Sequence, residues 1–328
     1  MHLRSVSLAV AVLVVVCVAP LTAQERLGDL VAQGGYDWVI GRWAATTDQG
    51  EKAEFRYDWA CDKHAILAET MIGGFKYEGI IMLSPGGGDV LDVGADNRGG
   101  MWKGSWSEDP AGLVHRVEYT NAEGDARKGD IVHNRVDANT IAIAVYGVDS
   151  GGSRDAEPWT KLTYKRQTAS ATAAASSSGQ TSSSADYQTL GDMVSQGGYE
   201  WLIGKWTATK DGRTYRLEHT PILDKHAALV RVEVGDFKYC GIVTYAPARQ
   251  EIAQIGADNM GRVWKATWEQ GDEGAVHKAD VAKPDGTTQK MQIVYIKGDN
   301  DTLKTKEYSI EGSSPALRDE LTFNRQKP

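Results

Sequence analysis

Two pairs of histidines recur along the chain at one spacing and could carry chemistry. His64 is repeated as His226, and His115 is repeated as His277, each 162 residues later. Each histidine alternates with apolar residues, which predicts strands whose imidazoles point inward with the apolar side chains. An inward imidazole could bind a metal or heme iron, or act as a general base. The alternative for each pair is a structural histidine held by a nearby Asp or a backbone carbonyl.

A Gly-Ala-Asp-Asn segment also occurs twice, ending at Asn97 and at Asn259. Alternation with the apolar residues before them predicts that both Asn side chains face inward, where each could anchor a ligand. Asp96 and Asp258 are then expected to face outward. The alternative is turn chemistry, because Asn and Asp followed closely by Gly favour a tight hairpin turn.

Two pairs of tryptophans share a strand face with one small residue between them. The pairs are Trp102 with Trp106, and Trp264 with Trp268. Gly104 lies between the first pair and Ala266 between the second, so each pair could leave a slot for a flat ligand. The alternative is ordinary filling of a barrel interior. The sequence has no nucleophile elbow, phosphate loop or zincin motif, and no His-x-His spacing that would predict a closed zinc site.

These residues belong to two copies of one domain. Residues 27–45 read LGDLVAQGGYDWVIGRWAA, and residues 190–208 read LGDMVSQGGYEWLIGKWTA. The differences are mild and the similarity continues for the length of a domain, so the chain is a tandem duplication. Residues 168–188 are rich in Ala, Ser, Thr and Gly, cannot bury a core, and are expected to form a flexible linker. The copies are then expected to span residues 24–167 and 189–328.

Within each copy the hydrophobic period is two. In the first copy, short alternating runs are separated by Gly, Asp and Asn. These runs lie near residues 64–72, 75–83, 90–97, 102–107 and 113–119, and further runs follow. About nine or ten strands and one short helix are expected per copy. Many short strands in hairpin order predict an all-β fold, and a barrel is favoured over a sandwich because it leaves no open edge. We therefore expect two tandem antiparallel up-and-down β-barrels, each preceded by a short helix.

Each copy has a Gly-x-Trp motif after its helix and an Arg in its last predicted strand. The Trp residues are Trp43 and Trp206, and the Arg residues are Arg166 and Arg325. Alternation places each Arg on the inward face. Helix, Gly-x-Trp and terminal Arg together resemble the calycin barrels, such as the lipocalins and fatty-acid-binding proteins. The resemblance implies that each Arg stacks on the Trp and closes one end of its barrel. The chain also resembles a bacterial secreted branch of such barrels without an assigned function and, more distantly, heme-binding barrels of the nitrobindin kind.

The formal net charge is −8 and the basic residues are not clustered, which argues against nucleic acid and anionic membranes as partners. Residues 8–18 form an unbroken apolar run after Arg4, too short to stay in a bilayer, and residues 21–23 suit a cleavage site. Residues 1–23 are therefore expected to be a cleaved signal peptide of a secreted or periplasmic protein that keeps no stable membrane span. A single N-terminal anchor is the alternative.

The expected mature chain keeps two cysteines, Cys61 and Cys240, which do not occupy matching positions in the repeat. Two cysteines exclude a disulfide scaffold. We expect two separate thiols, with one bridge between the domains as the alternative.

These features predict a non-enzymatic protein that binds a small hydrophobic or aromatic molecule in a mostly apolar lumen in each copy. Heme is the one cofactor that inward histidines suggest, although the sequence requires none. One alternative is an enzyme that uses His64 or His115 as a general base. The other is a structural or interaction module whose barrels are filled solid.

Overall fold

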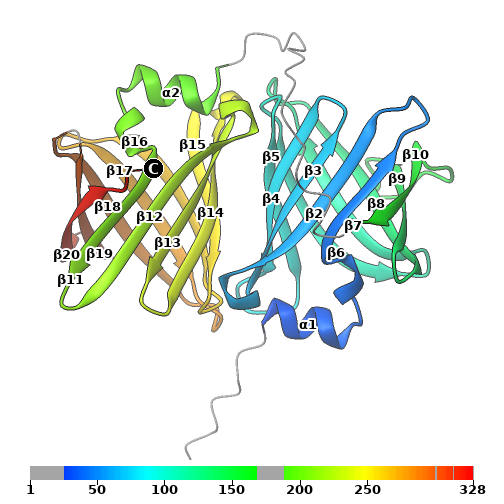
Figure 1. Cartoon of the computed structure of the whole chain (residues 1–328), viewed down its shortest axis with the longest axis horizontal. Helices are drawn as coiled ribbons and strands as arrows, with labels where there is room; N and C mark the ends of the chain where they lie inside the picture. Colours follow the sequence, from blue (N-terminus) through cyan, green and yellow to red (C-terminus); the bar gives the residue numbers. More distant parts are fainter. Residues whose placement is uncertain (1–25, 168–187, 300, 313, 328) are drawn as a thin grey trace, which may run out of the picture.

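The structure is a computed structural model that describes residues 26–167, 188–299, 301–312 and 314–327. The predicted signal peptide, residues 1–23, lies outside the described residues, as does the predicted linker apart from its last residue. The described chain forms two closed antiparallel β-barrels of ten strands each, and a short helix precedes each barrel (Figure 1). The predicted fold is thus confirmed. Among the described residues, no helix is long and apolar enough to cross a membrane.

In the first barrel, each strand pairs with its neighbours in sequence, and β1 pairs with β10 to close the sheet. Helix α1 (Leu27–Gln33) and the 3-10 turn η1 (Asp37–Val39) come before the strands, and the turn η2 (Cys61–Lys63) separates β2 from β3. The strands are β1 (Gly41–Thr46), β2 (Lys52–Ala60), β3 (Ala65–Ile72), β4 (Phe75–Leu83), β5 (Val90–Asp96), β6 (Met101–Asp109), β7 (Gly112–Thr120), β8 (Ala126–Asp137), β9 (Thr140–Val148) and β10 (Thr160–Arg166).

The second barrel repeats this order, and β11 pairs with β20 to close it. Helix α2 (Leu190–Gln196) and the turn η4 (Glu200–Leu202) precede its strands. Turn η5 (Leu223–Lys225) follows the second strand, and η6 (Pro247–Arg249) follows the fourth. The strands are β11 (Gly204–Lys210), β12 (Arg213–Ile222), β13 (Ala227–Val234), β14 (Phe237–Ala246), β15 (Glu251–Asp258), β16 (Val263–Gln270), β17 (Ala275–Ala282), β18 (Thr288–Lys297), β19 (Thr302–Glu311) and β20 (Ser314–Arg325).

In each barrel an arginine of the last strand lies over a tryptophan of the first. The Cζ atom of Arg166 is 4.1 Å from the ring centroid of Trp43, and Arg325 is 4.1 Å from Trp206. Arg166 also donates from Nη1 and Nη2 to two carbonyl oxygens between α1 and β1, at 2.8 Å each. Arg325 makes the two corresponding hydrogen bonds in the second barrel. The arginine therefore joins the last strand, the first strand and the segment after the helix.

The glycine of the Gly-x-Trp motif makes room for this arginine. Gly41 has φ of +118° and Gly204 has φ of +127°, a region that favours glycine. A Cβ at Gly41 would lie 2.8 Å from Nη1 of Arg166. The glycine and the distant arginine therefore form one constraint, because a side chain at the glycine would push the guanidinium off the tryptophan.

In β5 both faces are buried, and the sequence-based assignment of its inward face is wrong. Asp92, which pairs with Gly104, shares the lumen face with Asp96, and both side chains are buried. Ala95 lies on the other face, in a buried cluster with Leu223 and other residues of the second barrel. Leu91, Val93 and Ala95 face outward toward the other barrel, whereas Val90 lines the lumen.

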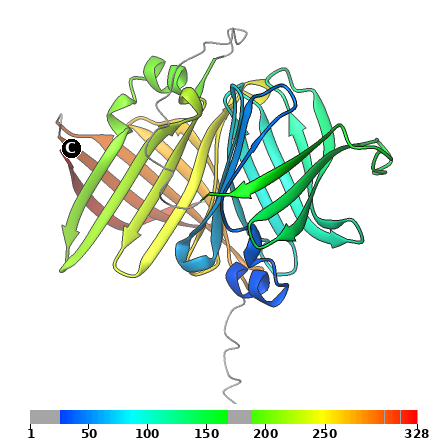
Figure 2. The ribbon, with the colours of Figure 1, turned by 45° about the vertical axis from the view of Figure 1, so that its right-hand side comes forward.

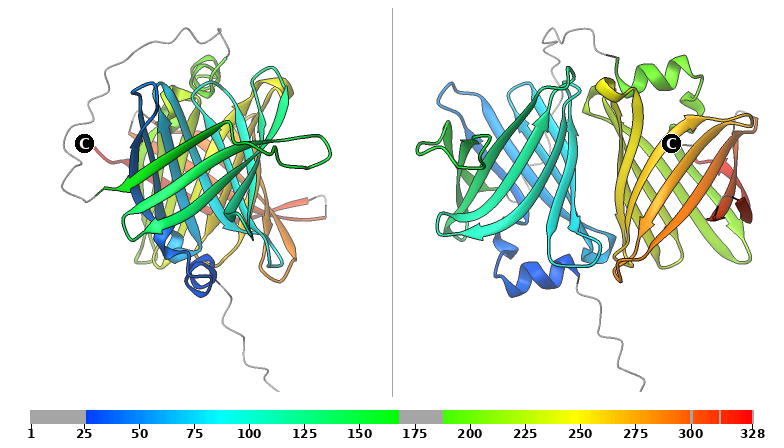
Figure 3. Two further views of the ribbon diagram at one scale, coloured as in Figure 1. Left: turned by 90° about the vertical axis from the view of Figure 1, so that its right-hand side faces the viewer. Right: turned by 180° about the vertical axis from the view of Figure 1, so that it is seen from behind.

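The two barrels dock through the outer faces of β4 and β14 and the adjacent 3-10 turns. Ile80 and Met82 on β4 are at most 1% exposed and belong to a cluster with Cys61, Cys240 and residues of β15. Figures 2 and 3 show the yellow strands of the second barrel lying along the blue-to-cyan strands of the first. Helices α1 and α2 lie at opposite ends of the pair, as expected for two copies related by a rotation of about half a turn (Figure 1).

Reciprocal polar contacts show the same symmetry. Lys76 Nζ lies 2.8 Å from the carboxylate of Asp224, and Lys238 Nζ lies 2.5 Å from that of Asp62. Lys76 is the repeat equivalent of Lys238, and Asp62 is the repeat equivalent of Asp224. A surface that contacts its own copy in this way is isologous, the arrangement of a twofold dimer. The duplication has placed both halves of such a dimer in one chain.

The aspartates reach across this interface from strained turns. Cys61, Asp62 and Lys63 have φ of 49°, 52° and 69°, and residues 223–225 have φ of 52°, 53° and 74°. Left-handed backbone in ordinary residues costs about 1–2 kcal/mol per residue, so such turns persist only where neighbouring contacts hold them. The ion pairs to the opposite barrel are such contacts.

We predict that mild oxidation joins Cys61 to Cys240. Both are buried free thiols, as expected, but their Sγ atoms lie only 3.2 Å apart. Diamide would remove two electrons and two protons and leave one disulfide between the barrels. After cleavage at a protease site introduced within residues 168–187, denaturing electrophoresis without reductant should show one linked species. The Cys61→Ser variant should give two fragments, and two fragments from the oxidised wild-type chain would contradict the docking.

Replacing Trp43 by Ala should lower the free energy of unfolding by about 3–5 kcal/mol, because Trp43 is only 1% exposed. Arg166→Ala should cost less, since an arginine over an indole contributes about 0.5–2 kcal/mol. Urea unfolding measures both values, and Trp206→Ala with Arg325→Ala is the matched pair in the second barrel. If the tryptophan and arginine variants lost the same free energy of unfolding, this description of a buried indole covered by an arginine would be contradicted.

Candidate functional site in the lumens under the two helices

A cavity of about 260 Å³ lies in the first barrel beneath α1. Leu30 and Val31 of the helix form its roof, and Tyr57 and Trp106 form part of its opposite wall. The remaining lining is mostly apolar, so the helix and the lumen together enclose a space suited to hydrocarbon or aromatic groups. The full lining is Leu27, Leu30, Val31, Gln33, Gly34, Tyr36, Val39, Tyr57, Ile66, Ile81, Gly88, Val90, Trp106, Ser107, Glu108 and Leu113.

The second barrel has the matching cavity beneath α2, with a volume of about 380 Å³. Met193 and Val194 form its roof, and His219 and Trp268 border it from the lumen. Small-molecule sites in proteins commonly occupy about 300–1,000 Å³. The second cavity therefore has the size of a ligand site, and the first lies just below that range.

A larger groove of about 820 Å³ runs outside the lumens, between the barrels and along the wall of the second. Its lining includes Leu91 and Met101 of the first barrel, and Ile242 and Lys265 of the second. The lumen histidines do not border it, and it shares no lining residue with the two helix-covered cavities, although Asp92 and Gln254 of the barrel walls are part of its lining.

Several buried polar atoms have no hydrogen-bond partner among the described residues, and we call such an atom open. In the first lumen, Nε1 of Trp106, Oδ1 of Asp92 and Nε2 of His115 are open. In the second, both ring nitrogens of His219 and both of His277 are open. Leaving a buried donor or acceptor unpaired costs about 1–3 kcal/mol. Among these residues, Trp106 borders the first cavity and His219 borders the second, so each cavity has one side chain with an open atom that a ligand could satisfy.

The floor of the first cavity is a stack of aromatic rings over a carboxylate. Trp106 lies parallel to His115 with their ring centroids 4.4 Å apart, and it lies 5.1 Å from His133. Nε2 of His115 is 3.1 Å from Oδ2 of Asp92, close enough for an ion pair, although the geometry is not that of a hydrogen bond. Tyr77 donates its hydroxyl to the same oxygen at 2.9 Å.

The floor of the second cavity keeps the tryptophan but has no carboxylate at this position. Gln254 stands where the first copy has Asp92. Its Oε1 accepts from Nε1 of Trp268 at 2.9 Å, and its Nε2 donates to the Tyr239 hydroxyl at 2.6 Å. The imidazole of His277 is tilted by 52° against Trp268, with centroids 4.8 Å apart.

One methyl group accounts for the difference between the two imidazoles. A Cβ at Gly104 would lie 2.2 Å from Nε2 of His115, so that ring occupies the space that the glycine leaves. The second copy has Ala266 at this position, and its methyl group prevents His277 from lying flat in the same place. His277 therefore keeps two open nitrogens.

Burial keeps His277, His219 and His133 neutral. It lowers the pKa of His277 to about 3, with a smaller contribution from His219. Burial also lowers the pKa of His219 to about 4, against the weaker influence of the Leu202 carbonyl, which already accepts a hydrogen bond from Trp206. In the first lumen burial lowers the pKa of His133 to about 3, although its Nδ1 lies 3.2 Å from the Ile131 carbonyl. At neutral pH each ring offers one donor and one acceptor.

Two of the four repeated histidines do not lie in the lumen. His64 and His226 follow the 3-10 turns η2 and η5, just before the strands to which the sequence assigns them. His64 contacts the Cys61 carbonyl through Nδ1 at 3.1 Å and borders a small cleft formed with the second barrel. The expected inward orientation is wrong for these two, because their turns leave the strand and approach the other copy.

Asn97 and Asn259 also belong to the interface. Oδ1 of Asn97 accepts from the backbone of Lys76 at 2.9 Å, and its Nδ2 donates to Asp224 at 3.3 Å. Asn259 makes the equivalent bond to Asp62 at 2.9 Å. The expected lumen position is therefore wrong, and the turn alternative describes these residues better.

Trp102 and Trp264 do face the lumens, but in a different layer from the cavities. Their indole nitrogens donate to the carboxylates of Asp96 and Asp258, at 2.9 and 2.7 Å. Both aspartates are fully buried, which corrects the expectation that they face outward. Of each tryptophan pair, only the second member, Trp106 or Trp268, borders a cavity.

The sequence reasoning missed His133 and His219 because neither has a histidine at the matching position. The first lumen has Tyr57 and His133, whereas the second has His219 and Tyr295 at the same two places. Each pair lies on either side of the central tryptophan, with centroids 5.1–6.1 Å from it. The tyrosine and histidine have thus exchanged positions, a signal that the 162-residue offset of the repeat already contains.

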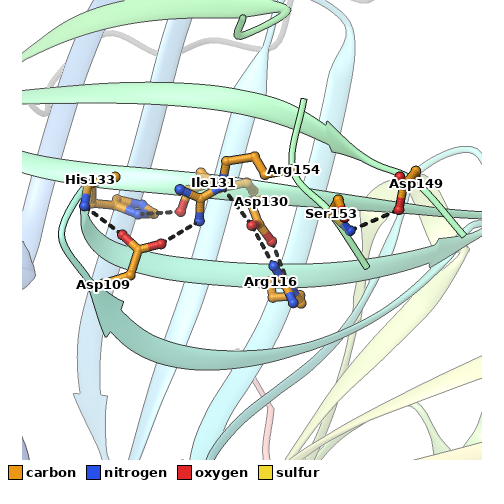
Figure 4. Close-up of polar contacts among 9 residues, drawn as sticks. Asp109, Arg116, Asp130, Ile131, His133, Asp149, Ser153 and Arg154 are labelled. Atoms are coloured by element: carbon orange, nitrogen blue, oxygen red, sulfur yellow. Dashed lines mark hydrogen bonds and ion pairs between the residues drawn. The ribbon is translucent and has the colours of Figure 1, made fainter. Parts of the chain in front are cut away.

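The strongest charged cluster of the first barrel lies on its outer wall and not in the lumen. Asp130 accepts from Arg116 and Arg154, with each N–O distance between 2.8 and 2.9 Å, and Arg154 also reaches Asp109 (Figure 4). Burial alone would raise the pKa of Asp130, but the two arginines outweigh it and lower the pKa. All the polar groups in this cluster have partners, which is typical of a structural network.

The residues of the lumens do not fit a heme. His115 fills the space between Trp102 and Trp106 that the sequence suggests for a flat ligand. In the second barrel the rings of His277 and Tyr295 lie 4.8 and 5.1 Å from that of Trp268, which leaves no porphyrin-sized gap at this level. Among the described residues, no group of three or more His, Cys, Asp or Glu could hold a metal ion.

Comparison with known proteins adds little to this geometry. No family model matches the chain, and no curated protein matches it. Among solved structures, the chain is similar to a protein of unknown function from the DUF3598 family of Nostoc punctiforme, with 10% identity and a TM-score of 0.25. The match covers 88% of this chain and 97% of that one. The strand pairing itself fits a pair of calycin-like barrels.

We predict that the buried histidines make stability depend on pH. The pKa of His277 is about 3 in the folded chain and about 6.5 in the unfolded chain, so the unfolded state binds more protons between these values. Stability should therefore fall as the pH falls below about 6.5. His277→Gln should reduce this slope by about 1.4 kcal/mol per pH unit, as measured by urea unfolding at pH 6.5 to 4.5.

Ile293→Val is the matched control, because Ile293 pairs with His277 across the neighbouring strand and does not titrate. It should lower the free energy of unfolding by about 0.5–1.5 kcal/mol without changing the slope. An unchanged slope in His277→Gln would mean that the imidazole is not buried in neutral form.

Proposed function

We propose that this protein binds one small, largely apolar molecule in the lumen of each barrel. The observation that carries the proposal is the pair of matching cavities, about 260 and 380 Å³, between each helix and a floor with open polar atoms. A solid structural module would be expected to fill both spaces, so the cavities favour binding over the filled-barrel alternative.

The apolar linings would supply most of the affinity. A ligand that buries about 250 Å² of apolar surface gains about 6 kcal/mol at 25 cal/mol per Å². Association and ordering cost an amount of similar size, so the match between ligand and floor decides the net affinity. The open atoms of Trp106 and His219 are the groups at which this match would be made.

Secretion or export to the periplasm is part of the proposal, supported by the apolar run at residues 8–18 and the cleavage-like residues 21–23. We also infer that the pair belongs with secreted calycin-like barrels of the lipocalin or nitrobindin kind. The short helix, the Gly-x-Trp motif and the arginine of the last strand support this placement.

The catalytic alternative has less support. His64 lies at the interface between the barrels, and His115 lies behind Trp106 and does not border the first cavity. A general base must come within hydrogen-bond reach of its substrate. The positions of His64 and His115 therefore do not favour a role as general base.

A neutral dye whose fluorescence rises in apolar surroundings, N-phenyl-1-naphthylamine, tests the proposal. Val31 and Val194 occupy matching positions in the two cavity roofs, so Val31→Trp and Val194→Trp should each fill one cavity. Titration should give two dye molecules per wild-type chain, one per single variant and none for the double variant.

Val136→Trp is the control, because Val136 is 61% exposed and lines neither cavity. It should bind as the wild-type chain does. Unchanged dye binding in a folded double variant would place the dye elsewhere and contradict the proposal.

A further inference from the structure

The two lumens differ in charge at matching positions. Asp92 lies one strand pair below the residues that line the first cavity and corresponds to Gln254, and Glu108 at the first cavity wall corresponds to Gln270. Both changes replace a carboxylate by an amide of similar shape. The adjacent wall position differs in the opposite sense, with Ser107 in the first cavity and Glu269 in the second, but Glu269 forms an ion pair with Lys278 at 2.5 Å. The lining is otherwise mostly apolar, so the difference concerns the polar part of a ligand.

The first lumen holds a buried carboxylate with an open oxygen. Asp92 is 3% exposed, its Oδ2 accepts a hydrogen bond from Tyr77 and lies 3.1 Å from Nε2 of His115, and its Oδ1 is open. On the lumen face the Asp92–Gly104 pair lies directly next to the Val90–Trp106 pair, whose members line the cavity. The carboxylate raises the pKa of the cavity residue Tyr57, adding to the larger effect of burial, so its field reaches the cavity. A donor or cationic head would be stabilised here, and an anionic head would be repelled.

The second lumen holds neutral groups that offer both donors and acceptors. His219 is 5% exposed and borders the cavity, and His277 is 3% exposed and lies beside Trp268. All four ring nitrogens are open. Of the two, only His219 borders the cavity, and a hydroxyl group there could donate to or accept from a nitrogen of its ring.

We propose that the two copies have diverged in the ligand head group they accept, so that the first lumen takes an amine and the second takes an uncharged hydroxyl compound. In both cases the body of the ligand is apolar. This inference rests on the proposed binding function and specifies its ligand class. It follows from two carboxylate-to-amide differences and from the alanine that separates His277 from the wall.

Three probes with one hydrocarbon chain and different heads test the inference: octylamine, 1-octanol and octanoate. Calorimetric titration of the full chain with Val194→Trp reports on the first lumen, and titration of the chain with Val31→Trp reports on the second. The first lumen should bind octylamine about tenfold or more tightly than octanol, because of the buried carboxylate. The second should show the reverse order, and octanoate should be the weakest probe for both.

Two conservative substitutions test whether the named groups set the preference. Asp92→Asn keeps an acceptor for Tyr77 but removes the charge, and it should abolish the preference of the first lumen for octylamine. Gln254→Glu keeps the acceptor for Trp268 and replaces the donor to Tyr239 by an acceptor, to which the Tyr239 hydroxyl can donate instead. It should give the second lumen an octylamine affinity about tenfold higher than before. The two roof variants alone remain decisive if either substitution prevents folding.

Different experimental results would overturn this inference and the proposed function. Equal affinities for octylamine and octanol in both lumens would leave binding intact and overturn the head-group difference. The same conclusion would follow if folded Asp92→Asn and Gln254→Glu chains kept the wild-type preferences. If no probe, and no neutral dye, bound to either lumen, the binding function itself would be wrong.

Discussion

The pairing of the last strand with the first, held by an arginine over a tryptophan, is the constraint on which the rest of each copy depends. Arg166 can cover Trp43 only because Gly41 has no side chain and adopts a positive φ. Once the sheet is closed, strand alternation decides which side chains are enclosed and which face outward. The helix then covers one opening, and the space between helix and floor becomes a cavity. The same closure leaves the outer faces of β4 and β14 free to dock on each other.

Much of this architecture could be predicted from the sequence. The repeat, the period of two and the Gly-x-Trp motif with its distant arginine predict two antiparallel barrels of about nine or ten strands each, and the structure has two barrels of ten strands. The orientation of individual side chains was harder to predict, because alternation identifies the buried face only where the opposite face meets water. In β5 both faces are buried, so the apolar face covered by the other barrel was mistaken for the lumen. Asn97 was misplaced with it, and His64 was misplaced because a left-handed turn precedes its strand.

The floor of each cavity could be predicted only in part, because its parts come from strands that are distant in sequence. His115 and His277 were identified because they repeat, whereas His133 and His219 were not, since each is matched by a tyrosine. Small changes after duplication explain how the copies differ. An added methyl group at Ala266 moves one imidazole away from the wall, and exchange of a carboxylate for an amide removes a charge from the floor. The barrel tolerates these changes because its closure lies elsewhere.

A space remains open beneath each helix. Crystals of the full chain under xenon pressure test this most directly, because xenon occupies apolar cavities and scatters strongly. One xenon site is expected beneath α1, near Val31 and Trp106, and another beneath α2, near Val194 and Trp268. Both sites should disappear when the corresponding valine is replaced by tryptophan. Well-ordered crystals with the two spaces filled by side chains and without xenon in either lumen would contradict the account.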